Sequence, residues 1–204
     1  MNDINLNHFI QLQSEMRACR LCPEDGHAVE PPAVTQGSIS AKMMTIGQAP
    51  GITEVETGRP FNAGSGKRLF EWLAQADIDE NWFRETQYMS SVTKCYPGRA
   101  KHGGGDRVPN RREQELCRPF LDQEIKLVHP EIIIPIGRLA INLFVKKGQP
   151  LNKIIGIEFQ WEDHWIIPLP HPSGASRWHQ SAENRALIDN AIDLIARRKS
   201  ALFG

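Results

Sequence analysis

The clearest candidates for chemistry in this chain are its four cysteines, Cys19, Cys22, Cys95 and Cys117. The first two form a Cys-x-x-Cys pair, and the other two lie far downstream. Four thiolates complete one closed metal site, either tetrahedral zinc or a four-cysteine iron–sulfur cluster. Because structural disulfides are rare in a reducing cytoplasm, metal ligation is the favoured interpretation. Such a site would tie the N-terminal segment to the middle of the chain.

A Gly-rich segment at 64–67 (Gly-Ser-Gly-Lys) suggests phosphate binding. It does not match the loop of nucleotide hydrolases, because Phe61 replaces the upstream glycine and neither Ser nor Thr follows Lys67. The free N–H groups of a helix start, together with a lysine, can hold one phosphate of a nucleic-acid backbone. A plain helix cap explains Gly64, Ser65 and Lys67 equally well, so both interpretations stay open.

A histidine between two prolines is a further candidate. His171 lies in a Pro-His-Pro sequence, and proline rings restrict the backbone that aims the imidazole. Ser173 and Ser176 make the following loop small and polar, which suits contact with a phosphate backbone. This pattern favours a binding role for His171 over an ordinary surface position.

The elements that must position these residues alternate along the chain. Short apolar runs predict strands at 42–46, 88–92, 132–136 and 165–169, and helical spacing predicts helices at 6–18, 109–128 (opened by Pro109) and 182–198, with further helices opening at 64 and 137. This order predicts an α/β fold, a three-layer sandwich with a central, mostly parallel sheet flanked by helices, as a single domain over residues 1–204. A polar, Gly-rich insert at 98–107 is predicted to be a mobile loop.

The predicted topology brings three polar residues to one place. Gln48, Ser91 and His171 each lie at the carboxyl end of a predicted strand. Ligands of parallel α/β sheets bind beyond those ends. We therefore expect one shared pocket.

The charge balance limits the possible functions. Lys and Arg total 24, as do Asp and Glu, so the formal net charge is zero. This argues against a protein that coats nucleic acid by charge alone, although a local basic groove remains compatible with it. No apolar run approaches the ~18 residues of a membrane helix, and the N-terminus has no signal-peptide layout, so a cytoplasmic protein is expected.

Six elements, taken in order, resemble the uracil-DNA glycosylase superfamily, most closely its iron–sulfur branch, family 4. They span the chain from Cys19 to the final helix, and no single one is specific. They are the Cys-x-x-Cys start, segments 47–51 (Gly-Gln-Ala-Pro-Gly) and 58–61 (Gly-Arg-Pro-Phe), Lys94-Cys95, segment 117–121 (Cys-Arg-Pro-Phe-Leu) and segment 171–173 (His-Pro-Ser).

The resemblance implies a [4Fe–4S] cluster on the four cysteines, which favours that cluster over zinc. It also implies that Gln48 lies in the first catalytic motif, that Phe61 stacks on the extruded base and that His171 faces a uracil carbonyl. The residues expected to contact the base are Gly47, Gln48, Ala49, Phe61, Ser91 and His171. The loop after His171 would enter the duplex, with Arg177 filling the gap left by the flipped nucleotide. The expected DNA contacts are Gly64, Ser65, Lys67, Ser173, Ser176 and Arg177.

Three departures from the family pattern affect these expectations. Gln48 stands where the family usually has Glu, so it cannot titrate, although it can orient a water; Glu54 is the nearest carboxylate in sequence. Ser91 stands where the family usually has an asparagine, which suggests a pocket that accepts other deaminated bases, such as hypoxanthine or xanthine. The insert at 98–107 lengthens the segment between Cys95 and Cys117.

The expected function is therefore a monofunctional, monomeric glycosylase that flips a uracil nucleotide out of DNA and hydrolyses its glycosidic bond. A donor from His171 and backbone N–H groups near Ala49 would stabilise the leaving anion. One alternative is a catalytically weak or inactive protein that binds damaged or single-stranded DNA. Another is a covalent trap for abasic sites that acts through His102.

Overall fold

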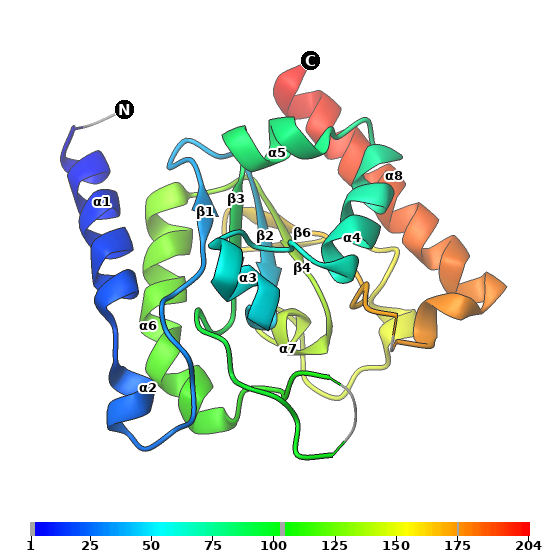
Figure 1. Cartoon of the computed structure of the whole chain (residues 1–204). Helices are drawn as coiled ribbons and strands as arrows, with labels where there is room; N and C mark the ends of the chain where they lie inside the picture. Colours follow the sequence, from blue (N-terminus) through cyan, green and yellow to red (C-terminus); the bar gives the residue numbers. More distant parts are fainter. Residues whose placement is uncertain (1–2, 103–104, 175) are drawn as a thin grey trace.

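A six-stranded sheet forms the centre of the part of the chain that the computed structural model describes, residues 3–102, 105–174 and 176–204 (Figure 1). Its order is β1-β3-β2-β4-β6-β5. The inner strands β3, β2, β4 and β6 are parallel, whereas β1 and β5 pair antiparallel at the two edges. The predicted, mostly parallel sheet is thus confirmed. The strands are β1 (Gln36–Gly37), β2 (Met43–Gly47), β3 (Tyr88–Ser91), β4 (Ile132–Pro135), β5 (Phe159–Trp161) and β6 (His164–Ile166).

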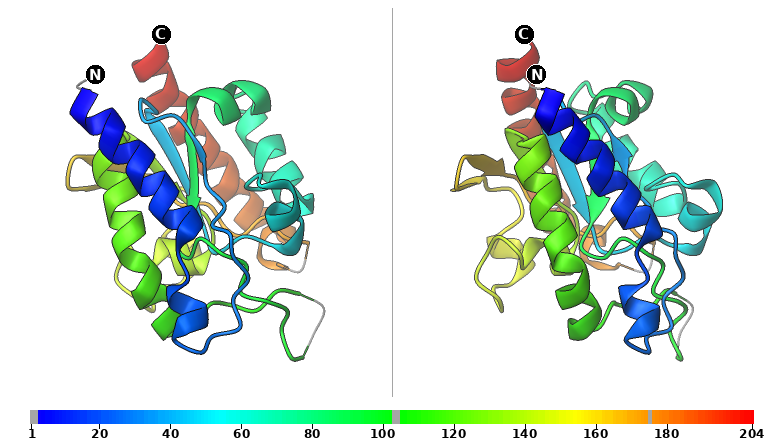
Figure 2. Two further views of the ribbon diagram at one scale, coloured as in Figure 1. Left: turned by 60° about the vertical axis from the view of Figure 1, so that its left-hand side comes forward. Right: turned by 90° about the vertical axis from the view of Figure 1, so that its left-hand side faces the viewer.

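Helices cover both faces of this sheet and give the predicted three layers. Helices α1 and α6 lie side by side on one face, and α4 and α8 lie on the other (Figures 1 and 2). Among the described helices, none is long and apolar enough to cross a membrane. The helices are α1 (Asp3–Ala18), α2 (Leu21–Glu24), α3 (Ile52–Thr57), α4 (Gly64–Ala74), α5 (Glu80–Thr86), α6 (Arg111–Val128), α7 (Arg138–Ile141) and α8 (Ala182–Phe203), with 3₁₀ turns at Leu151–Lys153 and Trp178–Gln180.

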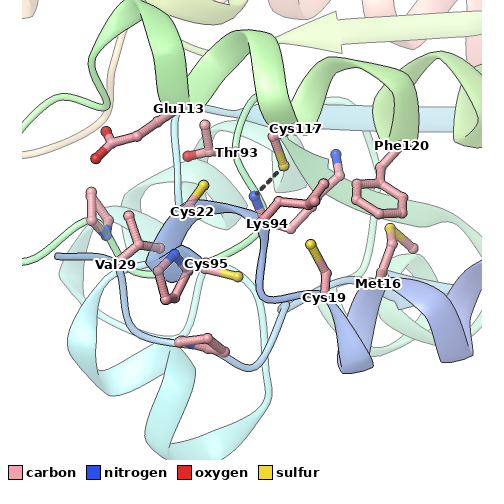
Figure 3. Close-up of a pocket in the computed structure, with 14 residues that line it drawn as sticks. Met16, Cys19, Cys22, Val29, Thr93, Lys94, Cys95, Glu113, Cys117 and Phe120 are labelled. Carbon is pink, nitrogen blue, oxygen red and sulfur yellow. Dashed lines mark hydrogen bonds between the residues drawn. The ribbon is translucent and has the colours of Figure 1, made fainter. Parts of the chain in front are cut away.

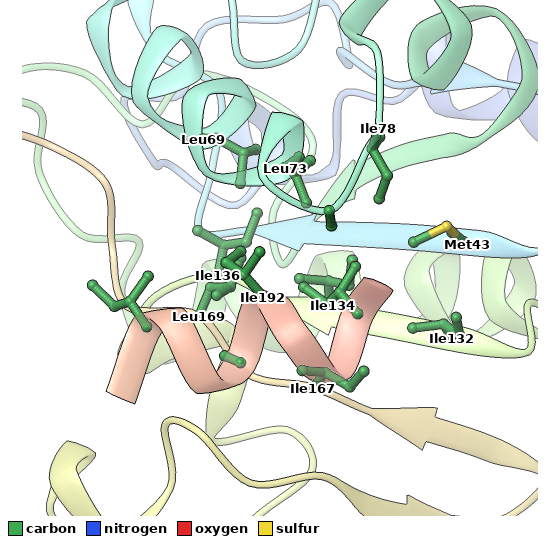
Figure 4. Close-up of a cluster of buried hydrophobic side chains, with 14 of the residues drawn as sticks. Met43, Leu69, Leu73, Ile78, Ile132, Ile134, Ile136, Ile167, Leu169 and Ile192 are labelled. Carbon is green, nitrogen blue, oxygen red and sulfur yellow. The ribbon is translucent and has the colours of Figure 1, made fainter. Parts of the chain in front are cut away.

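The continuous apolar runs of the inner strands are explained by burial on both faces. Met43 and Ile134 belong to one apolar cluster with α4 and α8, and Figure 4 shows Ile134 beside Ile192 of α8. Their neighbours in sequence, such as Ile133, point to the opposite face and pack with α1 and α6. The sheet is therefore held between two apolar layers, which leaves the ends of its strands as the place for polar groups.

Three details differ from the sequence prediction. Pro109 does not open α6, because Asn110 is the cap: its side chain accepts a hydrogen bond from Glu113 N at 3.0 Å. The strand predicted at 165–169 ends at Ile166, and Leu169 forms only an isolated bridge with Ile136. The helix predicted from 137 is a single turn, α7.

The insert predicted at 98–107 has regular pairing in its described part; residues 103 and 104 lie outside it. Arg99 and Asp106 form an antiparallel bridge. Arg107 N donates to Gly98 O at 2.9 Å, and Ala100 N donates to Gly105 O at 3.0 Å. The segment is therefore a hairpin, and its second arm leads into α6.

Candidate active site and cysteine pocket

A cavity of about 470 Å³ lies at the carboxyl ends of the inner strands β2, β3 and β4. It brings together most of the residues that are expected to contact the nucleobase, as the predicted topology requires. The predicted residues that line it are Gly47, Gln48, Ala49, Phe61, Ser65, Ser91, His171 and Ser173. Four of the expected DNA contacts, Gly64, Lys67, Ser176 and Arg177, do not line this cavity.

His171 has a defined protonation pattern. Its Nδ1 lies 3.2 Å from Ser173 N, and a backbone N–H can only donate, so Nδ1 is the acceptor. Burial lowers the pKa of the imidazole below its usual 6.5. The ring is therefore neutral, with its proton on Nε2. The adjacent loop is anchored from α4, because Arg68 donates to Pro172 O at 2.9 Å.

Phe61 reaches the cavity through an uncommon backbone conformation. Its φ is 51°, in the left-handed region that side chains disfavour. The buried guanidinium of Arg84 compensates by donating to Pro60 O at 2.7 Å and to Phe61 O at 2.8 Å. Gly47 makes room for the ring, since a Cβ there would lie 3.0 Å from Phe61 Cζ. Sequence reasoning missed Arg84, because an arginine in a polar segment is usually exposed.

Glu54 lines the cavity but is occupied by the chain itself. Its Oε2 accepts a hydrogen bond from Gly51 N at 2.6 Å, and its Oε1 accepts one from Asn62 N at 3.3 Å. Burial raises the pKa of this carboxyl. Glu54 thus joins the turn after β2 to the segment that carries Phe61.

Ser91 is buried at the end of β3, where it also lines the cavity. Its hydroxyl donates to Thr93 O at 2.7 Å. With its proton committed to the backbone, the hydroxyl offers the cavity only an acceptor. It therefore provides less hydrogen-bonding capacity than an asparagine amide would.

Two charged residues of the hairpin also line the cavity, and sequence reasoning missed both. Asp106 Oδ1 accepts a hydrogen bond from Tyr96 OH at 3.0 Å. Arg107 donates to both oxygens of Glu113, at 2.7 and 2.6 Å. The only sequence signal was a pair of charges at the end of a Gly-rich segment, which usually marks a solvated loop.

The four cysteines line one pocket beside the cavity (Figure 3). Cys19 follows α1, Cys22 lies in α2, Cys95 follows β3, and Cys117 is buried in α6. All four are free thiols whose sulfur atoms face a common space in Figure 3. The predicted grouping of these residues therefore occurs, although no set of three or more His, Cys, Asp or Glu among the described residues is arranged to hold a metal ion.

The pocket disfavours the charged, thiolate form of its cysteines. Burial and the nearby sulfurs raise the pKa of Cys22 to about 11 and that of Cys95 to about 12. Burial also raises the pKa of Cys117, whose sulfur accepts a hydrogen bond from Lys94 N at 3.3 Å. Four thiolates in such a place require a cationic partner.

A buried ion pair lies between the cysteine pocket and the cavity. Lys94 Nζ is 2.6 Å from Glu124 Oε2, and their side chains are 2% and 0% exposed. Glu124 also accepts hydrogen bonds from Tyr88 OH at 2.9 Å and from Ser90 Oγ at 2.8 Å. This network joins α6 to β3, the strand that ends at Ser91.

Known proteins are similar in sequence to most of this chain. The family model described as the uracil DNA glycosylase superfamily matches residues 34–195. A type-4 uracil-DNA glycosylase of Thermotoga maritima is 30% identical over 188 residues, 91% of this chain and 92% of the relative. A type-4 uracil-DNA glycosylase of Archaeoglobus fulgidus is 30% identical over 169 residues, 78% of either chain. One of Pyrobaculum aerophilum is 30% identical over 155 residues, 74% of this chain and 73% of the relative.

Proposed function

The chain belongs to the uracil-DNA glycosylase superfamily and to its type-4 branch, and from that premise we propose that it excises uracil from DNA by hydrolysing the bond between the base and the deoxyribose. The observation that carries the proposal is the cavity at the strand ends. It combines an aromatic ring, Phe61, with a neutral histidine, His171, whose Nε2–H has no hydrogen-bond partner among the described residues. A planar base with carbonyl acceptors fits both groups.

The chemistry follows from where charge develops. Breaking the glycosidic bond leaves negative charge on the base and positive charge on the sugar. His171 Nε2–H would donate to a carbonyl oxygen of the departing base, and this bond strengthens as the charge grows. Gln48 would orient the attacking water. Phe61 would stack on the flipped base, and Gly47 and Ala49 would contact its edge, as would Ser91.

The four cysteines fit a [4Fe–4S] cluster as the resident group. Their sulfurs face one common space, as four thiolates that share one inorganic group must. Cys19, Cys22, Cys95 and Cys117 would hold the cluster, which supplies a cross-link between α1, α2, the segment after β3, and α6. None of the steps of base excision requires it.

DNA would lie across the mouth of the cavity. The start of α4, with Gly64, Ser65 and Lys67, would contact one phosphate. Ser173 and Ser176 would follow the backbone beside His171, and Arg177 would fill the space left by the flipped nucleotide. We infer a monomer that works in the cytoplasm, where reduced cysteines persist.

A 5′-labelled duplex with one uracil tests this function. Anaerobically purified protein is incubated with it, and alkali and a denaturing gel follow. Strand cleavage at the uracil supports excision, and a thymine duplex is the matched control. An intact strand that is still retained in a gel shift would instead indicate a DNA-binding protein without turnover. A slow band resistant to denaturant would indicate the covalent trap, which the structure disfavours because His102 does not line the cavity.

The hydroxyl of Ser91 favours an extension of this function to other deaminated bases. Since it presents only an acceptor, the end of β3 cannot read both a donor and an acceptor on uracil. We expect hypoxanthine or xanthine duplexes to be cleaved within about 100-fold of the uracil rate, because loss of one paired contact costs roughly 1–3 kcal/mol. Cleavage confined to uracil would contradict this extension.

A further inference from the structure

The cavity lacks a carboxylate at the position where the type-4 pattern places one. Gln48 holds that position, and an amide can orient a water but cannot take its proton. Hydrolysis needs a proton acceptor, and the sugar passes through a cationic state that a nearby negative charge stabilises. The described cavity lining contains two carboxylates, Glu54 and Asp106.

Glu54 is poorly suited to this role. Both of its oxygens accept backbone hydrogen bonds, from Gly51 N at 2.6 Å and from Asn62 N at 3.3 Å. To accept a proton from water, Glu54 would have to give up a bond that holds the turn after β2. Its position is that of a capping group, since it completes the capping box of α3.

Asp106, unlike Glu54, has only one of its two carboxylate oxygens in a hydrogen bond with the described residues. One oxygen, Oδ1, accepts a hydrogen bond from Tyr96 OH at 3.0 Å, which fixes the rotation of the carboxylate. The other, Oδ2, accepts no hydrogen bond from the described residues and lies over the turn that carries Gln48. A methyl group built at Gly51 would lie 3.2 Å from this oxygen. The side chain therefore presents Oδ2 beside Gly51, in the same turn as Gln48, and both Asp106 and Gln48 line the cavity.

The hairpin that carries Asp106 is anchored at its base. Asp106 pairs with Arg99 across the hairpin, and the next residue, Arg107, binds both oxygens of the buried Glu113. Glu113 is itself fixed at the start of α6, where it accepts a hydrogen bond from Asn110 N at 2.8 Å. These contacts hold the base of the hairpin in place. The position of Asp106, next to Arg107, is therefore well defined.

We propose that Asp106 is the catalytic carboxylate of this enzyme and takes the place of the missing acid at position 48. As the glycosidic bond breaks, its electron pair leaves with the base, and Asp106 stabilises the cationic sugar. A water oxygen then bonds to C1′ of the sugar, and the proton that the water loses passes to Asp106 Oδ2. The products are the base anion, later protonated by solvent, and an abasic sugar with a hydroxyl at C1′.

This inference rests on the proposed function, and the Asp106→Asn variant tests it. Asparagine keeps the size of the side chain and its acceptor for Tyr96, but it removes the charge. We expect single-turnover cleavage of the uracil duplex to slow by roughly 10²–10³-fold. Affinity for the same duplex, measured by fluorescence anisotropy, should stay within about threefold or increase, because a negative charge near phosphates has been removed. Asp163→Asn, on the exposed turn between β5 and β6, is the matched control and should leave both quantities unchanged.

A rescue experiment separates chemistry from loop folding. In the Asp106→Asn background, Gln48→Glu supplies the attacking water with a carboxylate from position 48. This second change should restore cleavage to within about tenfold of the wild type. A damaged hairpin would not be repaired by a change at position 48. Asp106→Asn that cleaves at the wild-type rate, or slow cleavage that Gln48→Glu does not restore, would overturn the inference alone. A wild-type chain that leaves the uracil strand intact would overturn the proposed function and this inference together.

Discussion

The cysteine pocket and the base cavity are neighbours, and Pro97 lines both, but they are built on different principles. The pocket depends on one atom type, sulfur, delivered by four separate segments of the chain. The cavity depends on turns, on backbone N–H groups and on a few side chains held by the backbone, such as His171. The two regions therefore differ in how they tolerate substitution. Each of the four sulfurs is needed to complete the pocket, whereas the carboxylate that position 48 lacks would, in our proposal, come from Asp106 on a different segment.

The two regions are also connected. Cys95 and Cys117, at the two ends of one segment, line the pocket. Asp106, in the middle of the same segment, lines the cavity. Lys94 and Glu124 lie between them as a buried ion pair. A group that fixes Cys95 and Cys117 therefore also fixes the root of the hairpin. Metal binding in the pocket would pre-organise the cavity without taking part in the reaction.

We expect the largest effect from Cys117→Ser, in the cysteine pocket. The buried serine would leave three thiolates and a weak ligand, so the four-sulfur site could not close. Metal binding contributes directly to folding. For the proposed cluster we therefore expect this variant to lose iron and to show a lower, less cooperative thermal unfolding transition, a destabilisation of several kcal/mol. Iron analysis and calorimetry of anaerobic protein measure both.

The matched control for that variant is Met16→Leu, which also lines the pocket but keeps its volume. Such a change should cost less than about 1.5 kcal/mol and leave iron binding intact. Full iron content in Cys117→Ser would contradict the assignment of this residue as a ligand.

A smaller effect is expected from the connection between the regions. Lys94→Met leaves the carboxylate of Glu124 buried without its cation, a change that typically costs about 3–5 kcal/mol. We expect that loss in the free energy of unfolding by denaturant, together with slower base excision, since the network holds β3 in place. The double variant Lys94→Met/Glu124→Leu removes both charges and should recover part of the stability. Equal stability of the single variant and the wild type would disprove the structural importance of the pair.

Within the cavity, we expect His171→Ala to cost far more than Gln48→Ala. The histidine donates to charge that develops on the base, and loss of one such donor costs roughly 10²–10³-fold in rate. Gln48 only orients a water, so its loss should cost about tenfold or less. Single-turnover cleavage measures both, with duplex affinity as the control for folding. Equal losses would contradict this division of roles.

The sequence predicts both the cysteine pocket and the central residues of the cavity, for physical reasons. Cys19, Cys22, Cys95 and Cys117 are recognisable by residue type, and their common pocket follows from the requirement that thiolates share a cation. Gln48, Ser91 and His171 were placed together by topology, because the carboxyl ends of parallel strands meet. Both predictions rest on rules that do not depend on loop conformation.

The features that escaped prediction depend on tertiary contacts. Arg84 is buried only because the carbonyls of Pro60 and Phe61 turn towards it, which the local sequence does not show. Asp106 reaches the cavity because Arg107 binds Glu113, a contact within a segment with strong loop signals. The edge strands β1 and β5 have two and three residues, too few for an alternating pattern.

The smallest expected effect concerns the cavity and is the pH dependence of cleavage that His171 causes. Burial lowers the pKa of its imidazole below 6.5, so the neutral ring persists as the pH falls through 6.5. Single-turnover cleavage should therefore keep its plateau at that pH and decline only below it. The unfolded chain does bind a proton near 6.5, so the contribution of His171 to stability is present above 6.5 and is lost as the pH falls from there to the folded pKa.

The His171→Asn variant shows whether His171 causes the decline at low pH, because asparagine keeps an N–H donor but cannot titrate. Its rate should be lower than that of the wild type at every pH and should lack the decline that the imidazole causes. Rates at pH values from about 5 to 8 on the same uracil duplex decide the matter, because that range spans the usual histidine titration. A wild-type rate already halved at pH 6.5, beside a flat profile for His171→Asn, would mean that the ring titrates as if exposed. The cavity would then be open to water around His171, and it would differ from the cysteine pocket, in which Cys117 is buried, in solvent access as well as in construction.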